Sequence, residues 1–280
     1  MDWHERELSP AHLAAHLTQP TAIDNKYDRG VLGVLAGSLR FPGAALLNIE
    51  AAIRAGAGMV RYLGAQSLVK EIIAARPETV IAPGPVDAYL IGSGLVANDV
   101  SEHDQTLIFA ALETELPVIL DAGAMSFARK GRKYQLLTPH AGELSKLFAA
   151  WGKNVTSDEI EARPAKFVQL AAEMINSDIL LKGNTTYIAS HWEKEILAVS
   201  DLPTQLATAG SGDVLAGIIG ALIVQHPPQN ETEFIEITAL AVLLHAAAAK
   251  SHTTGPIAAL DIAQNLPEII AKWRTGDFTN

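Results

Sequence analysis

The stretch Ala-Thr-Ala-Gly-Ser-Gly-Asp at residues 207–213 runs into the apolar segment Val-Leu-Ala-Gly-Ile-Ile-Gly-Ala-Leu-Ile-Val-Gln at 214–225. That segment is too long for an ordinary strand and is apolar on every side, which predicts a buried helix. Gly210 and Gly212 flank Ser211, so the backbone can turn tightly, reach positive φ and let a ligand approach closely. We expect the rest of the chain to be arranged around this turn and helix.

The start of this helix has the chemistry of an anion site. A glycine turn that opens a buried helix directs free backbone N–H groups and the positive end of the helix dipole at one point. Asp213 is the only charged residue between Leu202 and Gln225. A carboxylate at this place can take a proton from a hydroxyl while a phosphoryl group arrives. The structural alternative is a helix start capped by Ser211 or Asp213, but the uncharged surroundings favour a functional role.

Composition limits the class of protein. The 280 residues are 49% hydrophobic, carry a net charge of −10 and include no cysteine. This length and apolar content predict one large α/β domain over residues 1–280. The negative charge argues against a nucleic-acid or anionic-membrane surface, and the missing cysteines exclude disulfides and thiol catalysis. The N-terminus lacks an apolar signal core and the apolar segments fall short of a membrane span, so we expect a cytoplasmic protein.

Apolar strands alternate with helices along most of the chain. This alternation predicts an α/β fold with three α/β/α layers and a mostly parallel central sheet. A hairpin near the sheet edge is expected at 185–189 and 196–199, and the predicted helices include 44–55, 106–115, 237–250 and 262–273. The other predicted strands are 31–36, 59–63, 88–91, 117–121, 134–138 and 179–182.

Glycine and polar residues gather where the predicted strands end. Ligands of such sheets bind beyond the carboxyl ends of the strands, so this clustering favours an enzyme over a structural protein. The segments concerned are Gly37-Ser38, Gly92 to Gly94, Asp121-Ala122-Gly123, Thr138-Pro139-His140 and Lys182-Gly183.

Taken in order, these segments resemble the ADP-dependent NAD(P)H-hydrate dehydratase family, a branch of the ribokinase-like superfamily. The resemblance runs from about Leu8 to near the C-terminus, and His245 also fits. The segments that carry it are 33–38 with 41–45, then 55–58, 92–95, 137–143, 181–186 and 207–217.

The resemblance implies a ribokinase-like fold and a hydro-lyase reaction that repairs damaged cofactors. The S-epimer of NADH hydrate or NADPH hydrate is dehydrated back to NAD(P)H, while ADP is cleaved to AMP and phosphate in the presence of Mg²⁺. Asp213 would deprotonate the C6 hydroxyl as that oxygen attacks the β-phosphate of ADP, and the hydroxyl would then leave as phosphate. The resemblance further implies a separate NAD(P)H-hydrate epimerase as functional partner, and we expect a homo-oligomer, either dimer or tetramer.

The family pattern assigns roles to individual residues. Ala44, Gly94, His140 and Asp213 would contact the hydrated cofactor, and Glu143 would have an indirect role toward magnesium. The amides of Ala209, Gly210, Ser211 and Gly212 would hold the transferring phosphoryl group. The nucleotide would be bound by Lys182, Gly183, Asn184, Thr185, Thr186 and Gly212.

Several of these residues also have plain structural interpretations. Lys182 could be a surface lysine followed by a capping glycine, His140 an exposed loop histidine, and Glu143 a residue in the first turn of a helix. The turn at 183–185 and the position of Thr138 at a strand end favour roles in a site for Lys182 and His140.

The chain departs from the family pattern at three places. Ser93 stands where many relatives have proline, Val96 stands where they have glycine, and the loop Asn25 to Gly30 differs from the commoner start. Serine at 93 still permits the turn but makes it less rigid than proline would. Valine at 96 allows fewer backbone conformations than glycine.

Two other functions use the same features. An ATP-dependent small-molecule kinase of the ribokinase-like superfamily would use the Gly-Ser-Gly-Asp turn equally well, but residues 42–45 and 139–140 fit the dehydratase better. A catalytically inactive nucleotide-binding regulator is the second alternative, and the intact Asp213 argues against it.

Overall fold

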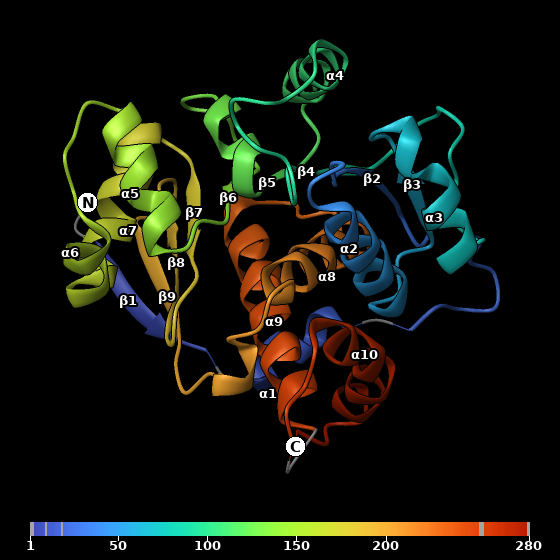
Figure 1. The fold of residues 1–280 in the computed structure, drawn as a ribbon. Helices are drawn as coiled ribbons and strands as arrows, with labels where there is room; N and C mark the ends of the chain where they lie inside the picture. The colour runs from blue at the N-terminus through green and yellow to red at the C-terminus, as the bar shows by residue number, and fades with distance from the viewer. Residues whose placement is uncertain (1–2, 9, 18, 252–254, 279–280) are drawn as a thin grey trace.

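The protein is built on one continuous sheet. In the computed structural model, which describes residues 3–8, 10–17, 19–251 and 255–278, the described strands number nine and lie in the order β1-β9-β8-β7-β6-β5-β4-β2-β3 (Figure 1). The strands are β1 (His4–Glu7), β2 (Val31–Leu35), β3 (Met59–Tyr62), β4 (Ala88–Ile91), β5 (Val118–Leu120), β6 (Gln135–Leu137), β7 (Asp178–Leu181), β8 (Thr186–Ser190) and β9 (Glu195–Val199).

The sheet is mostly parallel, as predicted. Only the pairs β7–β8 and β8–β9 are antiparallel, while β1 with β9 and all pairs from β3 to β7 are parallel. Successive side chains of a strand point to opposite faces, so Ile119 and Leu136 join one hydrophobic core while Leu120 and Leu137 join the other. Both cores are apolar because helices cover both faces of the strands.

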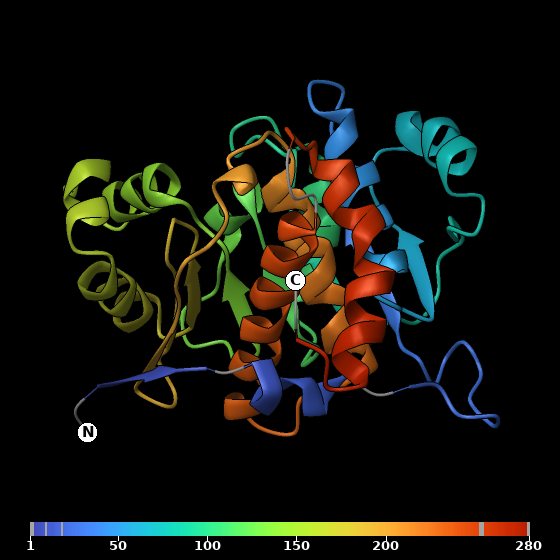
Figure 2. The same ribbon diagram turned by 90° about the horizontal axis from the view of Figure 1, so that it is seen from below.

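The helices form the two outer layers. Figure 2 shows α8, α9 and α10 lying side by side across one face, with α5, α6 and α7 grouped toward the other side of the molecule. The helices are α1 (Pro10–Leu13), α2 (Pro42–Arg54), α3 (Val69–Ala75), α4 (Glu102–Leu112), α5 (Ala141–Ala150), α6 (Ser157–Ala162), α7 (Pro164–Ile175), α8 (Ser211–Gln225), α9 (Glu231–Lys250) and α10 (Ala259–Arg274). The three-layer α/β/α architecture predicted from the sequence is confirmed.

The predicted apolar strands all occur, and the differences lie in polar segments. The hairpin β8–β9 is present near the sheet edge, as predicted, and β1 pairs in parallel with β9 as the edge strand. Sequence analysis missed β1, whose residues His4–Glu7 are all charged or titratable and show no apolar alternation. It also left α3, α5, α6 and α7 unassigned.

Helix α9 corrects the expectation that no segment is long enough to cross a membrane. It begins at Glu231, six residues before the predicted start at 237, and its 20 residues reach the length and mean hydropathy of a span. However, 83% of that apolar window is buried inside the fold. Its apolar surface is therefore covered by α8, α10 and the sheet.

Glycine at 217 lets α2 and α8 pack closely. A Cβ atom at this position would lie 2.4 Å from the backbone oxygen of Asn48 and 2.8 Å from Cβ of Ala51, both in α2. Any side chain here would force the two helices apart, and these helices carry residues of the site described below.

We predict that Gly217→Ala lowers the free energy of unfolding by about 1–3 kcal/mol, the usual cost of overpacking a core. Urea unfolding followed by circular dichroism measures this change. The control is Gly43→Ala in the first turn of α2, where a Cβ atom meets no atom within 4 Å and alanine favours the helix. Equal stability of the two variants would show that the contact between α2 and α8 is not close.

Candidate functional site

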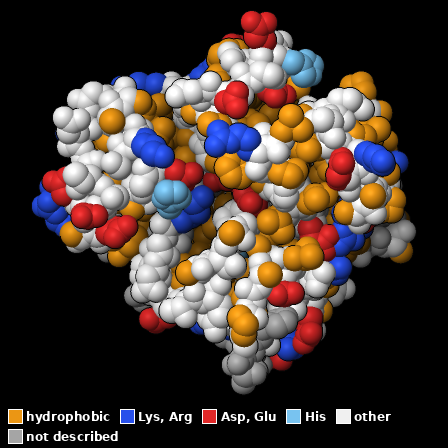
Figure 3. Space-filling model, in the orientation of Figure 1, with side chains coloured by type: hydrophobic (Ala, Val, Ile, Leu, Met, Phe, Trp, Pro, Cys, Tyr) orange, Lys and Arg blue, Asp and Glu red, His pale blue; other side chains and the backbone are white. Residues whose placement is uncertain are grey.

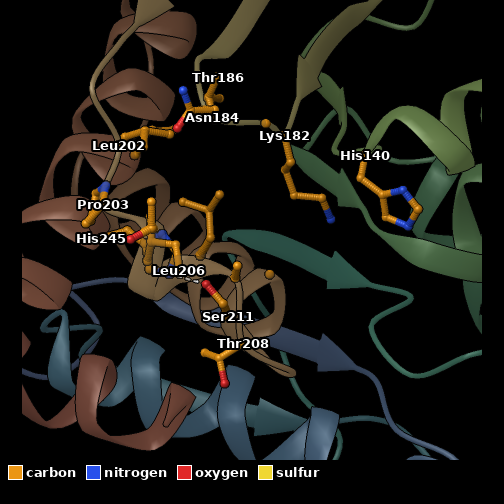
Figure 4. Close-up of a pocket in the computed structure, with 16 residues that line it drawn as sticks. His140, Lys182, Asn184, Thr186, Leu202, Pro203, Leu206, Thr208, Ser211 and His245 are labelled. Atoms are coloured by element: carbon orange, nitrogen blue, oxygen red, sulfur yellow. Dashed lines mark hydrogen bonds between the residues drawn. The ribbon is translucent and has the colours of Figure 1, made fainter. Parts of the chain in front are cut away.

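The carboxyl ends of β6 and β7 bring two predicted site residues together. His140 and Lys182 pair as an isolated parallel bridge beyond the strands, and the amide of Lys182 donates to the carbonyl of Pro139 at 2.8 Å. Figure 4 shows the Lys182 side chain extending from its strand into the space between His140 and the turn at Ser211. Residues 42 positions apart in the chain are thereby neighbours at one edge of the sheet.

The start of α8 faces the same place. Gly210 precedes the helix with φ 88°, a left-handed conformation that favours glycine. Gly212 lies in the first helical turn and uses no positive φ, so the expected backbone freedom is needed at Gly210 alone. A Cβ atom at Gly212 would lie 3.4 Å from Nζ of Lys182. The absence of a side chain at 212 therefore lets the lysine ammonium approach the helix start.

A partly buried ion pair with Asp121 fixes the position of Lys182. Its Nζ donates to Oδ1 of Asp121 at 3.0 Å and lies 3.9 Å from Oε2 of Glu143. Burial by itself would lower the pKa of Lys182, but the charges of Asp121 and Glu143 outweigh it and raise that pKa. Burial likewise would raise the pKa of Asp121, and Lys182 together with hydroxyl donors lowers it instead. Lys182 is thus a charged lysine fixed by its ion pair with Asp121, and it is not a surface lysine.

Asp213 has the ionisation behaviour of a base. Partial burial raises its pKa to about 6, and the charge of Asp121 adds to the rise, while Lys182 opposes it and Glu143 adds a smaller rise. The N-cap residue of α8 is Gly210, so neither Ser211 nor Asp213 stands at the capping position. The structural alternative of a simple cap is therefore wrong, and the Asp213 carboxylate remains available for chemistry.

His140 and Glu143 cap the start of α5. The Nδ1 atom of His140 accepts from the amides of Gly142 at 3.1 Å and Glu143 at 3.4 Å, and Oε2 of Glu143 accepts from the amide of His140 at 2.9 Å. Because Nδ1 accepts, a neutral His140 carries its proton on Nε2. Its Nε2 lies 3.5 Å from Oε2 of Glu143, and the His140 side chain is 59% exposed, so a ligand can reach this nitrogen.

A cavity of about 500 Å³ opens between the Lys182 turn, the start of α8 and the buried face of α9. Figure 4 shows Leu202, Pro203 and Leu206 on one side of it and Lys182 on the other. Figure 3 shows a hollow in the middle of this face with acidic and basic side chains gathered at its floor. Its walls comprise His140, Lys182, Gly183, Asn184, Thr186, Leu202, Pro203, Thr204, Leu206, Ala207, Thr208, Ser211, Gly212, Leu215, Val242 and His245.

Most of the residues expected to bind the nucleotide line this cavity, with one exception. Thr185 lies instead in the wall of a second cavity of about 500 Å³ on the far side of the same turn. Of the expected anion-binding residues, Ser211 and Gly212 line the first cavity, whereas Ala209 and Gly210 do not. Asp213 does not line the cavity either, but it directly follows Gly212, and the charge of Lys182 is close enough to lower its pKa.

Ala44 and Gly94 lie together but outside both cavities. Gly94 has φ 73°, and a Cβ atom on it would lie 2.7 Å from Cβ of Ala44. Leu47 is one turn further along α2 and packs on Gly210, where a Cβ atom would lie 2.4 Å from its Cδ1. Residues three apart share one side of a helix, so Ala44 lies on the side of α2 that meets the start of α8.

Sequence analysis did not assign roles to several buried polar residues of the site. Oγ of Ser211 and Nε2 of His245 share a hydrogen bond of 3.2 Å, and burial lowers the pKa of His245 to about 4, which keeps it neutral. Thr138 donates to Asp121 at 2.8 Å. The only feature of the sequence that could have indicated a role for Asn48 is that it is a polar residue in a mostly apolar helix. Within the described ranges, no three His, Asp or Glu side chains gather as ligands for a metal ion.

Comparison with known sequences identifies relatives along most of the chain. A profile of the family described as NAD(P)H-hydrate dehydratase matches residues 32–272. The bifunctional NAD(P)H-hydrate repair enzyme Nnr of Mycobacterium tuberculosis is 38% identical over 231 residues, which cover 78% of this chain and 46% of the relative. This chain thus spans about half the length of that relative. The ADP-dependent (S)-NAD(P)H-hydrate dehydratase of Neisseria meningitidis is 30% identical, over 84% of this chain and 81% of its own.

Solved structures give the same result for the fold. The ADP/ATP-dependent NAD(P)H-hydrate dehydratase of Bacillus subtilis, co-crystallised with ATP and Mg²⁺, superposes with a TM-score of 0.78 at 27% identity, covering 95% of this chain and 97% of its own. A ribokinase-like superfamily protein of Enterococcus faecalis superposes with a TM-score of 0.80 at 24% identity, covering 96% of each chain. The predicted ribokinase-like fold is confirmed.

We predict that Lys182→Met lowers the free energy of unfolding by about 3–5 kcal/mol, because it leaves the buried Asp121 carboxylate unpaired. The loss should grow from mildly acidic to neutral pH. Without Lys182, burial raises the pKa of Asp121 above its value in the unfolded chain, so stability is lost as pH rises through that pKa.

Urea unfolding of the wild type and the variant, at mildly acidic and at neutral pH, measures this loss of stability. The control is Lys272→Met, which removes a surface i,i+4 pair with Glu268 and should change stability by less than about 1 kcal/mol. A Lys182 variant as stable as the Lys272 variant would contradict a buried ion pair.

Proposed function

We propose that this chain, which belongs to the NAD(P)H-hydrate dehydratase family, dehydrates the S-epimer of NADH hydrate or NADPH hydrate and cleaves ADP to AMP and phosphate. This would make it a hydro-lyase of nicotinamide nucleotide repair. The names of the Neisseria and Bacillus relatives support the activity and its need for ADP or ATP. The observation that carries the proposal is a carboxylate of raised pKa at the start of a buried helix, next to a held lysine.

The first cavity suits an adenine nucleotide. Leu202, Pro203 and Leu206 offer an apolar wall for a planar base, and Asn184 and Thr186, which lie beside Leu202, offer polar groups at the edge of that wall (Figure 4). A nucleotide held in this way would direct its phosphates toward Lys182 and the amides at the start of α8, which both favour negative charge.

Asp213 would start the reaction. Its carboxylate takes the proton of the C6 hydroxyl, and that oxygen attacks the β-phosphorus of ADP as the bond from this phosphorus to the oxygen bridging to the α-phosphate breaks, releasing AMP. The amides at 209–212 would stabilise the charge on the transferring phosphoryl group. The ring nitrogen then donates its electron pair, the C6–O bond breaks to release phosphate, and loss of a proton from C5 restores the reduced nicotinamide.

Ala44, Gly94 and His140 would hold the hydrated nicotinamide against Asp213. A side chain at position 94 would clash with Ala44, so glycine keeps that loop close to the start of α2, and the exposed ring of His140 can donate a hydrogen bond from Nε2. Magnesium would enter with the nucleotide and neutralise phosphate charge. Glu143, which faces Lys182, would hold that ion only indirectly, through water.

The remaining expectations stay predictions. They are one domain over residues 1–280, supported by the single continuous sheet, a homo-oligomer, a cytoplasmic location, and a separate NAD(P)H-hydrate epimerase. The word bifunctional in the name of the mycobacterial relative is consistent with two linked repair activities in that protein.

The proposal is tested by incubating the protein with hydrated NADH, ADP and Mg²⁺ and following the absorbance of reduced nicotinamide. Absorbance should return only when all three are present, and Asp213→Asn should abolish turnover while its Kd for ADP stays within about threefold. The amide has the shape of the carboxylate but cannot accept the proton.

Asp158→Asn is the matched control, since Asp158 also lies in the first turn of a helix but is exposed. It should keep wild-type turnover. Phosphorylation of a small alcohol by ATP without action on the hydrate would favour the kinase alternative. Tight AMP binding with no turnover of any hydrate would favour the regulator.

The activity should also fall in mild acid. Because the pKa of Asp213 is raised to about 6, protonation removes the base below that pH, and kcat/KM should fall about tenfold for each further pH unit. Initial rates measured over a series of pH values, with ADP saturating, follow this acidic fall in kcat/KM. A fall that begins only near 3.8, the ordinary value for aspartate, would mean that Asp213 is not the base.

A further inference from the structure

A chain of buried polar side chains runs beneath the candidate site. It links α2, the turn after β4, the residue after β5 and the start of α8. Asn48 and Ser93 are fully buried and Asp121 is 3% exposed. Polar groups at such depth are costly unless they are hydrogen-bonded, so their arrangement needs a reason.

Asn48 ties this chain to the start of α8. Its Nδ2 donates to the backbone oxygen of Asp213 at 2.7 Å and to Oγ of Ser93 at 3.2 Å. An amide nitrogen has two hydrogens, so both bonds form together. The close approach of α2 and α8 at Gly217 is what brings Asn48 within reach. The backbone of Asp213 is thereby bonded directly to a side chain of another helix.

Ser93 connects Asn48 to the ion pair. Its hydroxyl accepts from Asn48 and donates to Oδ2 of Asp121 at 2.8 Å. The preceding Gly92 has φ 120°, and a Cβ atom there would lie 1.9 Å from the backbone oxygen of Asp121. The turn after β4 therefore lies directly against the residue after β5, which places the serine hydroxyl over the carboxylate.

The other oxygen of Asp121 completes the link. Oδ1 accepts from Nζ of Lys182 at 3.0 Å and from Thr138 at 2.8 Å. The hydrogen bonds thus run without a break from the ammonium group of Lys182, through Asp121, Ser93 and Asn48, to the main chain of Asp213. The two ends of this series are the cation and the carboxylate on which the proposed chemistry depends.

We propose that Ser93 is a positioning residue, whose hydroxyl couples the Lys182–Asp121 ion pair to the first turn of α8 and so sets the placement of Lys182 relative to Asp213. Ser93 itself touches neither cavity. Its kinetic consequences rest on the proposed dehydratase function, but its effect on Lys182 does not, because nucleotide binding can be measured without turnover.

Ser93→Ala removes only the hydroxyl and tests this role. We expect kcat for hydrated NADH to fall about tenfold and the Kd for ADP alone, measured by calorimetry, to rise at least about threefold, as for a lost hydrogen bond to a charged group. Ser93→Thr, which restores a hydroxyl, should recover most of both losses.

Ser177→Ala is the matched control. Ser177 is also fully buried and bridges main-chain and side-chain groups, accepting from Gln135 at 3.1 Å and donating to its backbone oxygen at 2.8 Å. It precedes β7 at the amino ends of the strands, far along the sheet from the site. Its removal should lower stability while kcat and the Kd for ADP stay within about twofold.

The outcomes separate the possible roles. If Ser93→Ala lowers stability but leaves kcat and the Kd for ADP unchanged, or if Ser177→Ala changes them equally, the positioning role is overturned. If the wild type fails to act on the hydrate while Ser93→Ala still weakens ADP binding, the proposed function fails and the positioning role stands. If Ser93→Ala does not fold, Asn48→Leu breaks the same link from its other end and should give the same two losses.

Discussion

The ion pair between Lys182 and Asp121 is the interaction on which the site depends. A lysine pointing into a partly enclosed cavity would lose its proton readily, because burial favours the neutral amine. Asp121 prevents this, and the lysine in turn keeps Asp121 ionised at almost complete burial. Asp213 lies near this pair and near Glu143, so two carboxylates raise its pKa and one ammonium group lowers it. This balance, added to partial burial, gives Asp213 a pKa in the range useful for a base.

The fold supplies this geometry by bringing strand ends together. Lys182 follows β7, His140 follows β6 and Asp121 follows β5, so three neighbouring parallel strands deliver three side chains to one edge. The start of α8 then approaches that edge from the helical layer. It can do so because Gly210 turns the chain and Gly217 admits α2 at close range. The ribokinase-like architecture is therefore what positions the charges, with the glycines setting the last few ångströms.

Much of this was predictable from the sequence, and the exceptions have physical causes. Composition predicts the apolar strands that are buried on both faces and the helix at 214–225, and glycine at strand ends indicates where ligands bind. The strand β1 could not be found because its edge position needs no apolar pattern. The polar link through Asn48 and Ser93 could not be found either, since it exists only when distant segments meet. Ser93, which departs from the family pattern, gains a role only in that context.

The ionisation of Asp213 itself gives the most direct test of a base held beside the Lys182–Asp121 ion pair. A carbon NMR titration of the aspartate side-chain carboxyls, with Asp213→Asn used to assign the resonance, reports this pKa in the free protein. A value of about 6 is expected, raised by burial and by Asp121. A value near the ordinary 3.8 would mean that the buried ion pair does not govern the neighbouring carboxylate, and the proposed base would have to be sought elsewhere.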